Sequence, residues 1–306
     1  MKKQITLHKM AKILLLLNFT FLTSMCFGQN YKAQFDNLCQ SGDTLNQKIL
    51  LTKWESEDPN NPELFTSYLN YCIQKSELAD LVMQPLRQNK ESLTQNNELQ
   101  IEDHKVTEPV NNQMIIKKGI DKIDIGIKKY PNRLDMRFDK IYALSLINDW
   151  DSFTNEIVKA IQYSQRNKNK WTWTYNVKKE NSKDFFLSSI QDYERNLLQT
   201  EDKTLFKNIR TIATEILTIY PNHIESLTNI SLTYVLSGDY DKGIETLLQA
   251  EKIESNNKNI LMSIALGYRL KGDKSNSLIY FEKMLKLDDQ NSVDFAKQQI
   301  NLLKNE

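Results

Sequence analysis

Histidine, glycine and cysteine are scarce in this chain of 306 residues, and each scarcity excludes a class of protein. Of the three histidines only His104 and His223 lie beyond residue 28, so no cluster of groups with tunable pKa values is available for catalysis. Eight glycines leave no glycine-rich phosphate loop. Three cysteines are too few for a disulfide framework. We therefore expect no catalytic residues and no cofactor.

The two remaining histidines do not indicate a metal site. His104 stands beside Glu102, Asp103 and Glu108, but neighbours in a flexible polar loop cannot converge on one ion without a scaffold. His223 follows Pro221-Asn222 at a predicted helix start, where we expect a solvated turn residue. The sequence therefore predicts no metal ligands.

The first 28 residues have the pattern of a secretory signal peptide. Four lysines precede an apolar run from Ile13 to Phe27, and the small residue Gly28 stands before Gln29. This run of 15 residues is shorter than the roughly 20 that a spanning helix needs. We expect a mature chain that begins at Gln29, has no membrane span and is periplasmic or extracellular. Retention as an uncleaved anchor is one alternative, and a lipid anchor on Cys26 is a second, less favoured because Thr23, Ser24 and Met25 do not match a bacterial lipobox.

A large excess of charge of one sign is also missing. Residues 1–28 hold four lysines and no acid, so the mature chain keeps 36 of the 40 basic residues against 39 acids, a net charge of −3. Such a balance does not favour nucleic acid. The mature chain contains Cys39 and Cys72, both on predicted apolar helix faces. We expect buried thiols, although an oxidising compartment would permit them to pair.

A 34-residue repeat is present instead. Gly238-Asp239 recurs as Gly272-Asp273, which defines the blocks 224–257 and 258–291. Each block has apolar residues at helical spacing on both sides of the Gly-Asp turn, which predicts two helices. Small residues stand where the two helices would cross closely. They are Ser231, Gly243, Ala250, Ala265 and Ser277.

Period, helix pair, turn and small residues together resemble the tetratricopeptide repeat (TPR) of exported bacterial proteins. Blocks of that family close on a proline; these two end on Ser255 and Asp289 instead, whereas Pro59, Pro131 and Pro221 close earlier blocks. The resemblance implies an all-α, right-handed α-solenoid of helix-pair repeats with two non-helical insertions. The spacing of the closing residues gives repeats at 29–61, 62–133 with 38 extra residues, 134–167, 190–223, 224–257 and 258–291, a 22-residue insertion at 168–189, and a capping helix at 292–306 that opens on Ser292.

Both insertions interrupt the helical period. The first contains SLTQNNELQIED, which predicts a short hairpin or a loop. The second contains WTWTYNV, where strict alternation predicts a strand with Trp171, Trp173 and Tyr175 on one face. This face is either a packing plug or an exposed strip that binds a protein or a glycan. Trp54 and Trp150 stand in repeat columns and are expected in the core.

The resemblance also implies a concave binding face made by the first helix of each pair. Its predicted columns hold Asn70, Phe138, Tyr142, Asn229, Leu232, Met262 and Leu266, with Asp135, Asp139 and Glu225 near them. Lysine and arginine are missing from these columns, so the carboxylate clamp of some family members is absent. Each apolar member also fits ordinary repeat packing.

These observations favour an exported, non-enzymatic adaptor that holds another protein or peptide and binds no nucleic acid. A glycan or cell-wall binder that uses the aromatic strip is the first alternative. An enzyme with unrecognised catalytic carboxylates is the second, and it would need two carboxyl groups with raised pKa values in one cleft.

Overall fold

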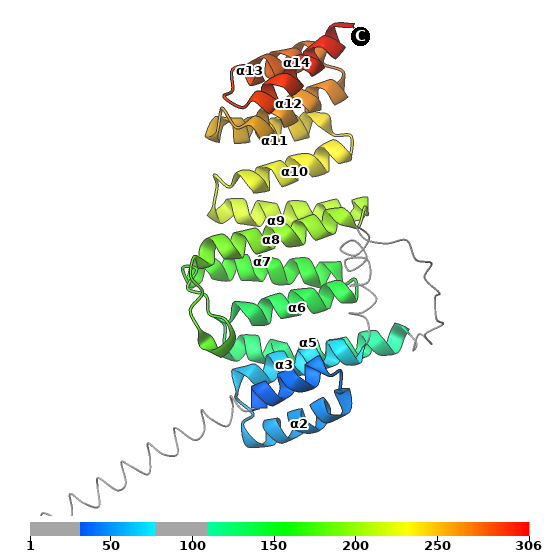
Figure 1. Cartoon of the computed structure of the whole chain (residues 1–306), viewed down its shortest axis with the longest axis vertical. Helices are drawn as coiled ribbons and strands as arrows, with labels where there is room; N and C mark the ends of the chain where they lie inside the picture. The colour runs from blue at the N-terminus through cyan, green and yellow to red at the C-terminus, as the bar shows by residue number, and fades with distance from the viewer. Residues whose placement is uncertain (1–30, 77–108, 306) are drawn as a thin grey trace, which may run out of the picture. The chain divides into compact units, whose positions relative to one another are not determined.

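The computed structural model describes residues 31–76 and 109–305, where the chain folds as an all-α solenoid of helix pairs (Figure 1). The predicted signal peptide, the SLTQNNELQIED segment and His104 lie outside these residues. No described helix is long and apolar enough to cross a membrane. Helices occupy residues 31–40, α2 (Thr44–Glu57), α3 (Pro62–Lys75), α5 (Pro109–Lys129), α6 (Leu134–Leu146), α7 (Trp150–Arg166), α8 (Ser182–Gln199), α9 (Phe206–Ile219), α10 (Ile224–Leu236), α11 (Tyr240–Ile253), α12 (Lys258–Lys271), α13 (Lys274–Met284) and α14 (Gln290–Asn305), with 3₁₀ turns η1 (Thr174–Asn176) and η2 (Lys203–Leu205).

The chain divides into two compact units, which are described separately. Unit 1 comprises residues 1–149 and 170–180, and unit 2 comprises residues 150–169 and 181–306. The second predicted insertion is thus shared between them. Its part in unit 1 has no regular helix beyond η1, whereas residues 182–189 form the first turns of α8. The fourth helix pair therefore starts eight residues earlier than predicted, because Phe186, Leu187 and Ile190 continue the apolar face of α8 into the core.

The Gly-Asp turns separate the two helices of a pair by one shared mechanism. Gly42, Gly238 and Gly272 have φ values of +69°, +81° and +85°, a left-handed conformation that glycine adopts without a Cβ clash. The aspartate after each glycine caps the next helix; the Asp273 side chain, for example, accepts from the Asn276 amide at 3.1 Å. The pair Gly-Asp therefore ends one helix and starts the next.

Two further turns use the same geometry with other residues. Asn148 has φ +55° before Asp149, and Glu201 has φ +59° before Asp202, whose side chain accepts from the Thr204 amide. Asparagine tolerates the left-handed region better than most residues, whereas glutamate adopts it at a cost of about 1 kcal/mol. These turns lack the glycine signal, so they could not be recognised from a search for Gly-Asp.

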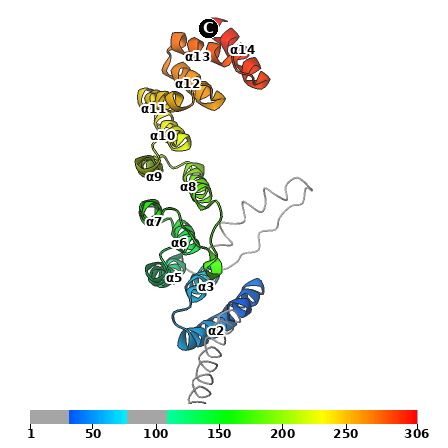
Figure 2. The same cartoon turned by 90° about the vertical axis from the view of Figure 1, so that its left-hand side faces the viewer.

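The small residues in the C-terminal repeats allow the close helix crossings that the sequence predicts. Ser231 donates to the Gly243 carbonyl at 2.8 Å, and Ser277 donates to the Ala265 carbonyl at 2.9 Å. A Cβ atom on Gly243 would lie 2.7 Å from Val235 Cγ2. Both predicted crossings are confirmed, and the helices of unit 2 follow one another in chain order in both views (Figure 2).

Replacing Gly243 with leucine is expected to destabilise unit 2 by about 1–3 kcal/mol, because the added side chain must displace Val235 from α10. The control is Glu245→Leu, which adds an apolar side chain at an exposed position of the same helix. Urea denaturation followed by circular dichroism measures both variants. Equal stability of the two leucine variants would show that the crossing tolerates a larger residue.

A terminal helix covers the last repeat, as predicted. Ala296, Ile300 and Leu303 of α14 are buried in one core with Phe281 and Met284 of α13. The predicted Ser292 cap is wrong: Ser292 lies inside α14, and its amide donates to the Asp289 side chain at 3.0 Å. Aspartate precedes the helix by the spacing that a cap requires, so it takes that role.

The N-terminal core of unit 1 contains both described cysteines. Trp54 is fully buried and stacks on Tyr31, with ring centroids 5.6 Å apart. Cys72 is buried and Cys39 half-buried at the edge of this core; both are thiols, and burial raises their pKa values to about 12 and 11. Trp150, in unit 2, is only half-buried, because it starts α7 and contacts Phe153 with one edge.

Candidate functional site

The second insertion folds as a tight turn, so the predicted strand is wrong. Thr172 makes isolated bridges with Arg133 and Lys178, and no extended strand forms in the described residues. The Thr172 amide donates to the Asn132 carbonyl at 2.9 Å, and its carbonyl accepts from the Leu134 amide at 3.0 Å. The alternation of WTWTYNV thus reflects a chain that reverses direction against the turn between α5 and α6.

The reversal places two residues in the left-handed region. Tyr175 and Asn176 have φ values of +59° and +57°, the signs found in type I′ turns, and the Val177 amide donates to the Thr174 carbonyl. This conformation costs a tyrosine about 1–2 kcal/mol. The Tyr175 amide donates to Glu63 Oε1 at 2.8 Å, and this half-buried bond to a carboxylate offsets the strain.

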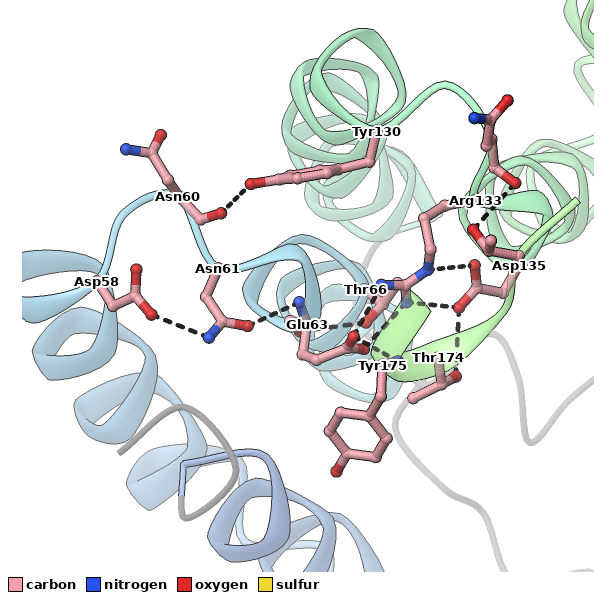
Figure 3. Close-up of polar contacts among 12 residues, drawn as sticks. Asp58, Asn60, Asn61, Glu63, Thr66, Tyr130, Arg133, Asp135, Thr174 and Tyr175 are labelled. Atoms are coloured by element: carbon pink, nitrogen blue, oxygen red, sulfur yellow. Dashed lines mark hydrogen bonds and ion pairs between the residues drawn. The ribbon is translucent and has the colours of Figure 1, made fainter. Parts of the chain in front are cut away.

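A buried ionic cluster holds the turn (Figure 3). Arg133 is 1% exposed and makes two bonds to each of two carboxylates. Its Nη1 and Nη2 donate to Glu63 at 2.7 and 3.0 Å, and its Nε and Nη2 donate to Asp135 at 2.8 and 2.6 Å. Burial alone would lower the pKa of Arg133. The hydrogen bonds to Asp135 and Glu63 together outweigh this effect, so the pKa of Arg133 is raised above its ordinary value. Thr174 Oγ1 donates to Asp135 Oδ2 at 3.2 Å, so both acids also bind the insertion.

The cluster contains more carboxyl groups than guanidinium groups. Asp139 lies one helical turn beyond Asp135 on α6 and is half-buried. Burial raises the pKa of Asp139 to about 7, and the neighbouring Asp135 carboxylate adds a smaller shift in the same direction. Arg133 and Lys32 oppose the shift. These acids do not form a set of metal ligands, and the other described residues contain none either.

The three aromatic residues of the insertion have different surroundings. Trp171 is 1% exposed and belongs to the core of unit 1. Trp173 is half-buried, contacts Phe138 edge-on at 6.1 Å and lies under the Lys179 ammonium at 5.3 Å. Tyr175 is 49% exposed, and in Figure 3 its ring points away from Arg133. The first two act as a plug, and only Tyr175 remains as an exposed aromatic surface.

The predicted concave-face residues also differ from one another. In unit 1, Asn70 is exposed on α3, Phe138 is buried against Trp173, and Tyr142 is half-buried on α6. In unit 2, Leu232 is 41% exposed on α10, whereas Met262 and Leu266 of α12 pack at the edge of the terminal core. Their role in binding stays a prediction.

Asn229 has an internal partner. Its side-chain amide donates to Glu194 Oε2 at 2.8 Å, and Glu194 of α8 is fully buried with Oε1 unpartnered. Burial raises the pKa of Glu194 to about 8, against the lowering effect of the Asn229 bond. A carboxyl group without a cation beside it is held in its neutral form at pH 7.

Stability of unit 2 is expected to fall as pH rises from about 4.5 to about 8. The unfolded Glu194 carboxyl ionises near its ordinary pKa of 4.5, whereas the folded one keeps its proton to about 8, so only the unfolded state gains from deprotonation in this window. Glu194→Gln removes this dependence, and we expect the variant to match the parent at pH 4 and to be about 1–3 kcal/mol more stable at pH 9.

Urea denaturation at pH 4, 6 and 9 compares Glu194→Gln with the parent. Asp139 in unit 1 contributes a dependence of the same sign, but it is present in both proteins and cancels from the difference. Asp192→Asn, at an exposed position of α8, is the matched control. A constant difference between Glu194→Gln and the parent at all three pH values would contradict a neutral buried carboxyl.

His223 caps a helix, so the predicted solvated turn residue is wrong. Its Nδ1 accepts from the Ser226 amide at 3.3 Å, and its Nε2 lies 3.5 Å from Glu225. Burial lowers the pKa of His223, which keeps the ring neutral and able to accept this bond. An imidazole at the N-cap is uncommon, and the sequence has no signal for it.

Glu63, Arg133 and Glu194 were not found by sequence reasoning. Arg133 follows a closing proline in KKYPNR, a position where exposed turn residues are common. Glu63 follows Asn61-Pro62, which predicts an acid of the first helical turn that faces solvent. The only signal was Asp135, an acid two residues after Arg133 at the start of a predicted concave helix.

Comparison with known proteins agrees with this architecture. Residues 224–257 match the family model of the tetratricopeptide repeat. Residues 224–257 are therefore a tetratricopeptide repeat, and stacked repeats of this class form extended binding surfaces. No curated protein sequence matches it.

Three solved structures that match this chain share only 11–15% identity with it. MamA from Desulfovibrio magneticus RS-1 shares 12% identity with a TM-score of 0.29, covering 85% of this chain and 94% of that one. The P58(IPK) TPR domain shares 15% at a TM-score of 0.32, covering 91% and 64%. The TPR2AB domain of yeast Sti1 in complex with pHSP90 shares 11% identity at a TM-score of 0.34, covering 91% of this chain and 98% of that one. None of these similarities assigns a role to a residue.

Proposed function

We propose that this chain is an exported, non-enzymatic adaptor that holds another protein. The observation that supports it best is the stack of helix pairs, because proteins built from such stacks present a large rigid surface without a chemical site. Export rests on the lysine-rich start and the short apolar run of residues 1–28. Exposed apolar side chains on first helices, Leu232 and Leu236 on α10 and Leu270 on α12, give such a surface apolar contacts.

The glycan alternative is weakened because most of the predicted aromatic strip is packed against other residues. Trp171 and Trp173 pack against unit 1, so a flat aromatic platform for a sugar is reduced to Tyr175. The enzymatic alternative is not favoured either. Of the two carboxyl groups with raised pKa values in residues 31–76 and 109–305, Glu194 is fully buried and cannot touch a substrate, and Asp139 lies in the other unit.

Affinity capture with the mature protein from the envelope extract of its own source tests this proposal. We expect a protein to be retained, and Leu232→Asp or Tyr175→Ala to reduce its retention by about tenfold, because both side chains are exposed and apolar. Leu302→Asp, at an exposed position of α14, is the control. Retention of nothing above the control resin, or quenching of tryptophan fluorescence by cell-wall sugars, would refute the adaptor.

A further inference from the structure

The exposed side of the docked insertion is basic. Residues 170–180 carry Lys170, Lys178 and Lys179 against one acid, Glu180, in a mature chain of net charge −3. Lys170 and Lys178 are exposed, and no carboxylate among the described residues pairs with either. Lys179 lies over Trp173 at 5.3 Å. The ammonium groups therefore produce a local positive field in a chain that is otherwise slightly acidic.

Two apolar side chains lie between these lysines in the sequence of the turn. Tyr175 is 49% exposed and Val177 61% exposed. Their backbone is fixed, because the Tyr175 amide donates to Glu63 and the Val177 carbonyl accepts from the Trp173 amide at 2.8 Å. An apolar pair on a fixed turn loses little conformational entropy when it is covered, which favours binding.

The neighbouring α5–α6 turn carries a further exposed lysine. A shallow cleft of about 310 Å³ lies between the two turns, lined by Lys129, Tyr130, Pro131, Asn132, Arg133, Thr172 and Asn176. Lys129 is exposed, and among the described residues its ammonium group donates to the uncharged amide oxygen of Asn60. Arg133 adds no net charge, because Glu63 and Asp135 surround it.

We propose that this insertion surface, made of Lys170, Tyr175, Val177 and Lys178, binds an acidic segment of a partner protein. Partner carboxylates would pair with the lysines, and a large apolar side chain of the same segment would cover Tyr175 and Val177. Charge complementarity favours an acidic partner, since a basic or uncharged segment would leave these ammonium groups without a counter-charge. The proposal rests on the adaptor function and specifies the partner.

Synthetic peptides test the chemistry with the full mature protein. They share a Phe-Leu core and differ in their flanking residues, which are Asp and Glu, Asn and Gln, or Lys. Fluorescence anisotropy should show the acidic peptide binding about tenfold more tightly than the neutral one, with the advantage lost in high salt. Equal binding of the three peptides, or no binding of the acidic one, would overturn the proposal.

Charge reversal locates the surface. Lys170→Glu with Lys178→Glu should weaken binding of the acidic peptide by about tenfold or more, and Tyr175→Ala should weaken it for all peptides. The control reverses Lys203 and Lys286, two exposed lysines of unit 2, and should leave binding unchanged. Circular dichroism and melting should be the same for all variants, since every altered side chain is exposed.

Capture from the extract separates this inference from the proposed function. If the parent retains a partner and the Lys170→Glu, Lys178→Glu variant retains it equally, the insertion surface is not the binding site, and the adaptor function stands. If the parent retains nothing, the adaptor function itself is wrong.

Discussion

Replacing Arg133 with methionine is expected to destabilise unit 1 by about 3–5 kcal/mol. The side chain is 1% exposed and neutralises Glu63 and Asp135, whose side chains are 3% and 6% exposed. Without the guanidinium, two carboxylates remain buried beside each other with no cation, and removal of one partner from a buried ionic group is far more costly than loss of a surface pair. The insertion should also detach, because both acids bind its backbone or hydroxyl groups.

Denaturation by urea, with tryptophan fluorescence as a local probe, measures this effect. Arg195→Met is the matched control, since Arg195 pairs with Asp192 at an exposed site where the loss should stay below about 1 kcal/mol. The triple variant Arg133→Met, Glu63→Gln, Asp135→Asn should recover a large part of the loss, because no unpaired charge remains. A triple variant as unstable as the single one would show that packing, and not charge, dominates.

Removing residues 292–306 is expected to destabilise unit 2 by about 3–6 kcal/mol and to cause self-association. The cut deletes Ala296, Ile300 and Leu303, and each large apolar side chain contributes about 1.5–3 kcal/mol when buried. It also exposes Phe281 and Met284 of α13 to water, and an uncovered terminal repeat presents an apolar face to other copies of the chain.

Matched controls are available within the same helix. Deletion of residues 304–306 leaves the buried positions intact and should be neutral. Ile300→Asp should reproduce most of the effect of the long deletion, whereas Leu302→Asp, at a position 45% exposed, should not. Calorimetry and light scattering report the two properties. A truncated protein that melts like the parent and stays monodisperse would mean that α14 does not act as a cap.

The local elements of this fold could be predicted because their signals are local. Gly238 and Gly272 take a positive φ without a Cβ clash, and the following aspartates cap the next helix, so two residues define each of these turns. Ser231 and Ser277 are small because a close helix crossing excludes larger side chains. The two C-terminal helix pairs and the apolar stripe of α14 follow from these rules.

The fate of the second insertion depended on the tertiary structure. Alternation of apolar and polar residues predicted a strand, but a strand needs a partner edge, and only the α5–α6 turn was beside it. The sequence determined the helix pairs, their period and their turns, because each depends on residues a few positions apart. The tertiary structure alone decided that Glu63 and Arg133, 70 residues apart, would meet, and that Glu194 would be buried beside Asn229, because the burial of a charge depends on which distant side chains surround it.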